Sequence, residues 1–217
     1  LGASLLIGAS GVYVLFFSGV RVMLLKNKWL NLLLLSSLLG GSLFLAWNYF
    51  LIAYQKRRIL TLFNPESDPL GSGYHIIQSK IAIGSGGFTG KGIAKGSQSQ
   101  LDFVPEQSTD FIFSVLAEEL GFLGVLLLII IYSLIIYRCL ILSLRCEDNF
   151  SRLLGASLTF VFFTYIFVNI GMVSGLLPVV GVPLPLISYG GSSLITLMAS
   201  FGIIMSIHKH KGPRYLQ

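Results

Sequence analysis

The chain has 217 residues, of which 54% are apolar and only 11% charged, and its mean hydropathy is +0.81. A soluble globular protein carries about 25% charged residues, so this chain lacks the charge that would cover it in water. The composition excludes a soluble enzyme and predicts an all-α integral membrane protein, a polytopic helix bundle. No charged segment precedes the first apolar run, which argues against a signal peptide and for a chain that begins inside a longer protein.

Five apolar segments are candidates to cross a bilayer, which takes about 20 residues in a helix. In chain order they are residues 1–25, 29–54, 110–142, 153–173 and 190–208. The third lies in a proline-free stretch from Thr109 to Arg145, interrupted only by Gly121 and Gly124 as weak breaks. A continuous helix of that length would run about 55 Å, against a hydrocarbon core of about 30 Å. Its first turns are therefore expected at or just above the outer interface.

The short loops predict the orientation of the chain. Basic residues cluster around Lys26 and Lys28, around Arg145, and in the tail from Lys209 onward, whereas residues 174–188 carry no charge. Short basic loops mark the cytoplasmic side, so the C-terminus is expected inside the cell. The long polar loop, residues 55–109, and the 174–188 loop are then extracytoplasmic. Since the basic residues are scattered at membrane edges, nucleic-acid binding is not expected.

The long polar loop is the most informative part of the sequence. The residues 74–83 have loosely helical apolar spacing that suits an element lying in the interface, and glycines then dominate through Gly96. The run GSGGFTGKG is no Walker motif, because Ser85 and Gly92 stand where that pattern needs Gly and Ser or Thr. The connection 178–191 has three prolines and no charge, so it is expected to tuck back into the bundle.

Asp110 is the sharpest candidate for chemistry. It shares a narrow sector of the third helix with Ser114, Ala117 and Gly121, and Glu118 lies at the edge of that sector. A small, polar stripe on a broadly apolar helix is expected to face inward, and an ionisable residue there is a functional candidate. The alternative is a carboxylate that only stabilises the helix N-terminus, by about 0.3–1 kcal/mol.

The other candidate site residues are polar or charged side chains of the long loop and of the helix that follows it. Lysines beside glycine-rich backbone could approach a phosphate, although ordinary solvated lysines explain the pattern equally well. Loop carboxylates could serve acid–base chemistry, although most are merely solvated. The candidates for substrate binding are Lys80, Arg57, Arg58, Lys91, Gln78, Glu106 and Glu118.

Several long motifs resemble one family. They are NPESDPLGSGYHIIQSKIAIGSGG, GKG, QSQLDFVPEQSTDFIFSVLAEELG and LPLISYGGSS, and with them the whole chain resembles the SEDS family of RodA, FtsW and SpoVE. The NPESDP and YHIIQSKIAIGSGG segments are more similar to the RodA branch than to FtsW. The resemblance covers the C-terminal half of a ten-span domain, so residues 1–217 are expected to form half of one membrane domain that is inactive alone.

The resemblance implies a multi-pass protein of the bacterial inner membrane that polymerises lipid II into peptidoglycan glycan strands. It places the family's essential aspartate on Asp110. Implied partners are lipid II, the growing glycan strand, membrane lipids, the elongation machinery and a class B penicillin-binding protein, the transpeptidase that cross-links the strands. The implied role is cell elongation and maintenance of rod shape.

A mechanism follows as a hypothesis. An inverting displacement at the anomeric carbon needs one general base, assigned to Asp110, and positive charge for the leaving pyrophosphate. A divalent cation such as magnesium could share that second task, although no metal-ligand cluster stands in the sequence. Two alternatives remain open at this point: a lipid II flippase, and a scaffold without catalysis that holds the transpeptidase.

Overall fold

The computed structural model describes residues 2–18, 37, 41, 44–67, 71–100 and 108–209, and every regular element within them is helical. The expected all-α class is confirmed. Half of the second expected span, 29–54, lies outside the described residues. The elements are α1 (Gly2–Phe17), the π-helical η1 (Ala46–Phe50), α3 (Ala53–Phe63), the 3₁₀ turn η2 (Pro65–Ser67), α4 (Ser72–Gly86), α5 (Ser97–Gln100), α6 (Ile112–Leu144), α7 (Asn149–Val173) and α8 (Gly191–Lys209).

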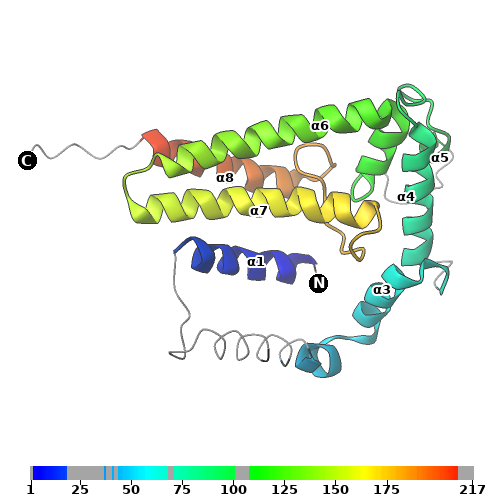
Figure 1. The fold of residues 1–217 in the computed structure, drawn as a ribbon, viewed down its shortest axis with the longest axis horizontal. Coiled ribbons are helices and arrows are strands. Elements are labelled where there is room, and N and C mark those ends of the chain that lie inside the picture. Colours follow the sequence, from blue (N-terminus) through cyan, green and yellow to red (C-terminus); the bar gives the residue numbers. More distant parts are fainter. Residues whose placement is uncertain are drawn as a thin grey trace, which may run out of the picture.

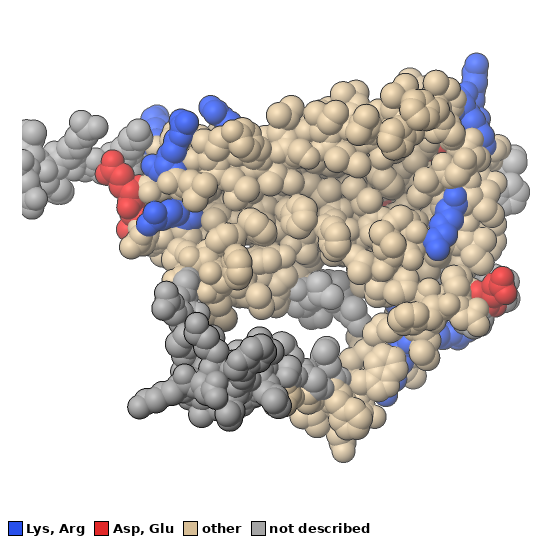
Figure 2. All heavy atoms as spheres, in the orientation of Figure 1, with Lys and Arg blue, Asp and Glu red and all other residues tan. Residues whose placement is uncertain are grey.

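Three of these helices, α6, α7 and α8, are long and apolar enough to cross a membrane, and α1 adds a shorter apolar helix. The helices α6 and α7 lie side by side and antiparallel, α8 packs against both, and α1 runs along α7 (Figure 1). On the face shown in Figure 2, charged side chains gather at the two ends of this bundle and leave an uncharged band between them. That distribution is the one a membrane-spanning bundle requires, because charge is costly in the hydrocarbon core.

The elements of the long polar loop gather at the end of the bundle where α6 begins (Figure 1). The helix expected over residues 74–83 is present as α4, and the glycine-rich residues 87–96 form the irregular loop that was expected. One face of α4 is buried against the bundle, with Ile76, Ser79 and Ala82 at most 1% exposed. The Ser79 hydroxyl donates to the Val173 carbonyl at 2.8 Å, which ties α4 to the end of α7.

The expectation of one continuous third helix is wrong at Gly121, where φ is +66° and the helix breaks. Figure 1 shows the first turns of α6 turned sharply away from the axis of the remainder. A break exposes backbone groups that must find other partners. The loop of residues 87–92 supplies them through four main-chain bonds of 3.0–3.2 Å: Lys91 N to Glu118 O, Gly92 N to Glu119 O, Phe122 N to Gly87 O and Leu123 N to Phe88 O.

The connection between α7 and α8 is tucked into the bundle, as its composition indicates. Val179, Val182 and Leu184 are at most 7% exposed. Prolines carry no N–H donor, so a proline-rich segment has fewer backbone groups to satisfy when it is buried. The Tyr132 hydroxyl of α6 donates to the Pro185 carbonyl at 2.6 Å, which gives one buried carbonyl of the connection a hydrogen-bond partner.

Candidate active site

Asp110 lies in a short turn, residues 108–111, whose main chain is bonded to the connection between α7 and α8. The Ser188 hydroxyl donates to the Thr109 carbonyl at 2.6 Å. The Tyr189 amide donates to the Ser108 carbonyl at 2.9 Å. The start of α6 is therefore held at a defined position relative to residues 188–189.

Asn169 of α7 joins the same two segments. Its side chain is fully buried, and Nδ2 donates to the Asp110 carbonyl at 2.9 Å and to the Val182 carbonyl at 2.7 Å. Its acceptors are main-chain carbonyls of the turn and the connection rather than a side chain on another helix, so Asn169 fixes the backbone beside Asp110.

The Asp110 carboxylate lies against bare backbone of the connection. Its side chain is half-buried, and a Cβ placed on Gly181 would lie 3.1 Å from Asp110 Oδ2. Gly181 has φ +71°, a conformation that other residues rarely adopt. The absence of a side chain at residue 181 therefore leaves the space that the carboxylate uses.

Two of the candidate basic residues reach the same connection. Arg58 of α3 donates from Nη1 to the Val179 carbonyl at 2.9 Å, and its guanidinium stacks over the Tyr54 ring. Lys80 of α4 extends over Gly175, where a Cβ would lie 2.6 Å from Lys80 Nζ. Lys80 thus contacts the connection at Gly175, Arg58 contacts it at Val179, and Asp110 contacts it at Gly181. Three residues that lie far apart in the sequence thus each contact the same connection.

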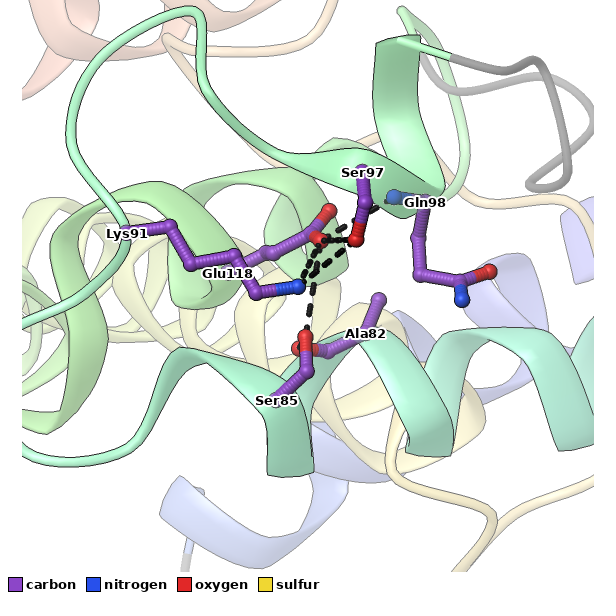
Figure 3. A network of polar contacts seen from close by, with 6 residues as sticks. All are labelled: Ala82, Ser85, Lys91, Ser97, Gln98 and Glu118. Atoms are coloured by element: carbon purple, nitrogen blue, oxygen red, sulfur yellow. Dashed lines mark hydrogen bonds and ion pairs between the residues drawn. The ribbon is translucent and has the colours of Figure 1, made fainter.

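Glu118 lies two turns further along α6 in a separate polar network (Figure 3). Its carboxylate is fully buried, and Oε1 lies 2.7 Å from Lys91 Nζ, whose side chain is 30% exposed. The same oxygen accepts from the main-chain N–H of Gln98 at 3.0 Å, and the hydroxyls of Ser97 and Ser85 lie 3.3 and 3.4 Å away. A buried carboxylate requires such partners, because an isolated charge in the interior is very unfavourable.

The two carboxylates therefore have different surroundings, although the sequence places them on one stripe. The expectation that Ser114, Ala117, Glu118 and Gly121 face inward is confirmed, since all four are buried. Sequence reasoning missed that Lys91 is the counterion of Glu118. Its only hint was the small, glycine-rich surroundings of Lys91, which allow close approach of the loop to α6. As substrate ligands, Glu118 and Lys91 stay predictions.

The remaining candidates are less constrained by the structure. Arg57 is exposed on α3 and Gln78 is half-buried on α4, whereas Glu106 lies outside the described residues. Sequence reasoning missed a contact of the residue that follows Asp110: the His75 ring of α4 stacks on Phe111, with centroids 5.6 Å apart and an interplanar angle of 18°. Among the described residues, no group of three or more His, Cys, Asp or Glu side chains could hold a metal ion.

A cavity of about 430 Å³ lies between α7, α8 and the connection. Its wall is largely apolar, with Phe162 and Phe201 on the two helices and Pro183 and Pro185 on the connection. Ser188 lines it as well, and this is the residue whose hydroxyl bonds to the Asp110 turn. Ser188 therefore both lines the cavity and bonds to the turn that carries Asp110.

The fold and the charge distribution define a polytopic helical membrane protein with a polar site at one end of its bundle. The chain belongs to the FtsW/RodA/SpoVE family of cell cycle proteins, whose family model matches residues 1–212.

Relatives in this family carry enzyme names. The chain is 54% identical over 211 residues to the peptidoglycan glycosyltransferase MrdB of Escherichia coli K12, covering 97% of this chain and 55% of that protein. It is 46% identical over 155 residues to the peptidoglycan glycosyltransferase RodA of Treponema pallidum, covering 71% of this chain and 36% of that protein. The chain spans about half the length of MrdB.

A solved structure supports the fold. It is the structure of a peptidoglycan synthase complex that coordinates polymerization and crosslinking. The TM-score is 0.73 at 31% sequence identity, and the match covers 100% of this chain and 57% of the other.

Proposed function

We propose that the complete protein containing this chain is a peptidoglycan glycosyltransferase that polymerises lipid II on the outer side of the bacterial inner membrane. The observation that carries the proposal is that Asp110, Lys80 and Arg58 each lie against the connection between α7 and α8. One carboxylate and two cations at one end of an apolar bundle suit a lipid-linked substrate that carries a sugar and a pyrophosphate. The names of MrdB and RodA support the same activity.

Asp110 is the general base of the proposed reaction. A sugar hydroxyl of one lipid II molecule attacks the anomeric carbon of the growing strand, and its proton passes to the Asp110 carboxylate. The bond between that carbon and the lipid pyrophosphate breaks, and the pyrophosphate leaves with the electron pair. The donor linkage is α and the product linkage β, so one inverting displacement is sufficient. A positioned base of this kind contributes about 10²–10⁴-fold to the rate.

Lys80 and Arg58 are proposed to stabilise the charge that develops on the pyrophosphate. Fixed cations aimed at developing charge are effective in a site that excludes water. Lys80 is exposed, so a substrate can reach its ammonium. Arg58 already donates to Val179 and contacts Tyr54, which holds its guanidinium in place. Arg57, Gln78, Glu106, Glu118 and Lys91 remain weaker candidates, and a magnesium ion carried by the pyrophosphate would supply further positive charge.

The cellular setting is proposed to be elongation and maintenance of rod shape. The similarity to MrdB and RodA supports this assignment. The proposed partner is a class B penicillin-binding protein, because the solved relative belongs to a complex that coordinates polymerization with crosslinking. The proposed orientation puts the Asp110 end of the bundle outside and the C-terminus in the cytoplasm.

The test is lipid II polymerisation by the complete protein, purified with its transpeptidase and compared with the Asp110→Asn variant on a glycan-strand gel. Asn keeps the shape of Asp but is no base, so the rate is expected to fall by about 10²–10⁴-fold. Co-purification of the transpeptidase and an unchanged unfolding temperature serve as controls. Normal polymerisation by the variant would overturn the role of Asp110. Absence of strands from the wild type would favour a flippase or a scaffold.

A further inference from the structure

We propose that the connection between α7 and α8 positions Asp110 for catalysis, with Gly181 and Ser188 as its positioning residues. This inference rests on the proposed function, because it assumes that Asp110 is the base. Neither residue needs to touch the substrate. Gly181 leaves the carboxylate its space, and Ser188 fixes the main chain that carries it.

The case for Gly181 is steric. An added Cβ would lie 3.1 Å from Asp110 Oδ2, a distance tighter than nearly all real Cβ contacts. The φ of +71° adds strain for any residue with a Cβ. Because the added Cβ crowds the carboxylate and the strain disturbs the backbone beside it, even alanine is expected to shift the carboxylate. A displacement of about 1 Å in a reacting group can lower the rate by about 10²-fold.

The case for Ser188 is its pair of hydrogen bonds. Its hydroxyl accepts from the Leu184 amide at 2.7 Å and donates to the Thr109 carbonyl at 2.6 Å. One side chain thus closes the turn of the connection and fastens the residue before Asp110. Asn169 adds a bond to the Asp110 carbonyl itself, so the main chain on both sides of the Thr109–Asp110 peptide is restrained.

The connection is firm enough to act as a support. Val182 and Leu184 are at most 2% exposed, and Pro185 accepts a hydrogen bond from Tyr132. Leu186 has φ +68°, which is unfavourable for a residue with a Cβ and persists only where the surroundings hold it. Strain of this kind, two residues before Ser188, indicates a backbone whose shape is imposed by its contacts.

The first test compares Ser188→Ala with Ser188→Thr in the complete protein, with kcat and KM for lipid II measured separately. Alanine removes both bonds, and kcat is expected to fall about tenfold while KM stays within about twofold. Threonine keeps the hydroxyl that makes both bonds, and Ser188 lines a cavity rather than solid packing. It is therefore expected to restore kcat. Equal kcat for alanine and wild type would overturn the role of Ser188.

The second test compares Gly181→Ala with Gly87→Ala. Gly87 also has positive φ, at +58°, but an added Cβ there meets nothing within 4 Å. Both variants carry backbone strain, and only Gly181→Ala crowds the carboxylate. A fall of about tenfold or more in kcat is expected for Gly181→Ala alone. Equal kcat for the two variants would overturn the role of Gly181.

The outcomes separate this inference from the proposed function. If Asp110→Asn is inactive while Ser188→Ala and Gly181→Ala have normal kcat, the base stands and the positioning role fails. If Asp110→Asn polymerises normally, the proposed function of Asp110 fails. If Gly181→Ala does not fold, the Ser188 pair still decides, because rescue by threonine distinguishes a lost hydrogen bond from a lost fold.

Discussion

Asp110 lies in the turn just before α6 and Glu118 on the buried face of α6, and the structure gives the two carboxylates opposite surroundings. Glu118 is fully buried, with its charge matched by Lys91 of the loop that covers the break at Gly121 and its Oε1 bonded to the main-chain N–H of Gln98 in α5. Asp110 is half-buried against Gly181, on a connection that Lys80 also reaches. Glu118 thus holds a loop in place, whereas Asp110 is the carboxylate that we propose to meet the substrate.

The Lys91→Met variant tests whether Glu118 depends on its counterion, because it would leave the Glu118 carboxylate buried without one. Breaking a buried ion pair costs about 3–5 kcal/mol, and the lower end applies here because Lys91 is 30% exposed. We expect a free energy of unfolding lower by about 3 kcal/mol. Thermal unfolding of the complete protein in detergent measures it.

The matched control is the double variant Lys91→Met/Glu118→Gln, which removes the unpaired charge as well. It is expected to recover part of the lost stability, because a neutral pair needs no counterion. A double variant no more stable than Lys91→Met would show that Glu118 does not depend on Lys91 for its charge.

The second prediction concerns Lys80, which contacts the same connection as Asp110. Lys80→Ala is expected to lower kcat/KM for lipid II by about tenfold, since a hydrogen bond to a charged group contributes about 1.5–3 kcal/mol and Lys80 is exposed. Stability should be unchanged. The control is Lys56→Ala on α3, whose ammonium lies 6.0 Å from the centre of the Trp47 ring. If both variants lose activity equally, the effect is one of general charge and not of Lys80.

The smallest expected effect concerns orientation. Burial raises the pKa of the Cys146 thiol above its usual 9.0, and Asp148 also raises it while Arg152 lowers it. Because the thiolate is the reactive form, labelling by a membrane-impermeant maleimide should be slow at neutral pH and faster as pH rises. Cys146 follows α6 at the opposite end from α4 (Figure 1). We expect labelling in inside-out vesicles only.

The control for that experiment is Cys146→Ser, which leaves Cys139 as the one cysteine of residues 1–217. That thiol is buried within α6, so no labelling is expected. Labelling of Cys146 in right-side-out vesicles would reverse the proposed orientation and put Asp110 on the cytoplasmic side.

Local patterns were readable from the sequence, and long-range contacts were not. The inward stripe of α6 follows from helical geometry alone, and α4 follows from the spacing of its isoleucines. The buried connection follows from three prolines without nearby charge. Each of these features depends on residues close together in the sequence, so local spacing and composition predict it.

The features that were missed join residues far apart in the chain. Lys91 and Glu118 are 27 residues apart, and Ser188 and Thr109 are 79 apart. Nothing in the sequence shows which glycines have positive φ, because glycine tolerates either sign. Gly121 could only be predicted as a weak break, since its strong break depends on the loop of residues 87–92 that bonds to both sides of it.

The most direct test of the account measures Asp110→Asn and Glu118→Gln side by side in the complete protein, each for polymerisation rate and for unfolding temperature. We predict that Asp110→Asn loses about 10²–10⁴-fold in rate at unchanged stability. Glu118→Gln should unfold at a temperature lower by several degrees and keep most of its rate below that temperature. A stable Glu118→Gln protein that makes no strands, together with an active Asp110→Asn protein, would contradict the account.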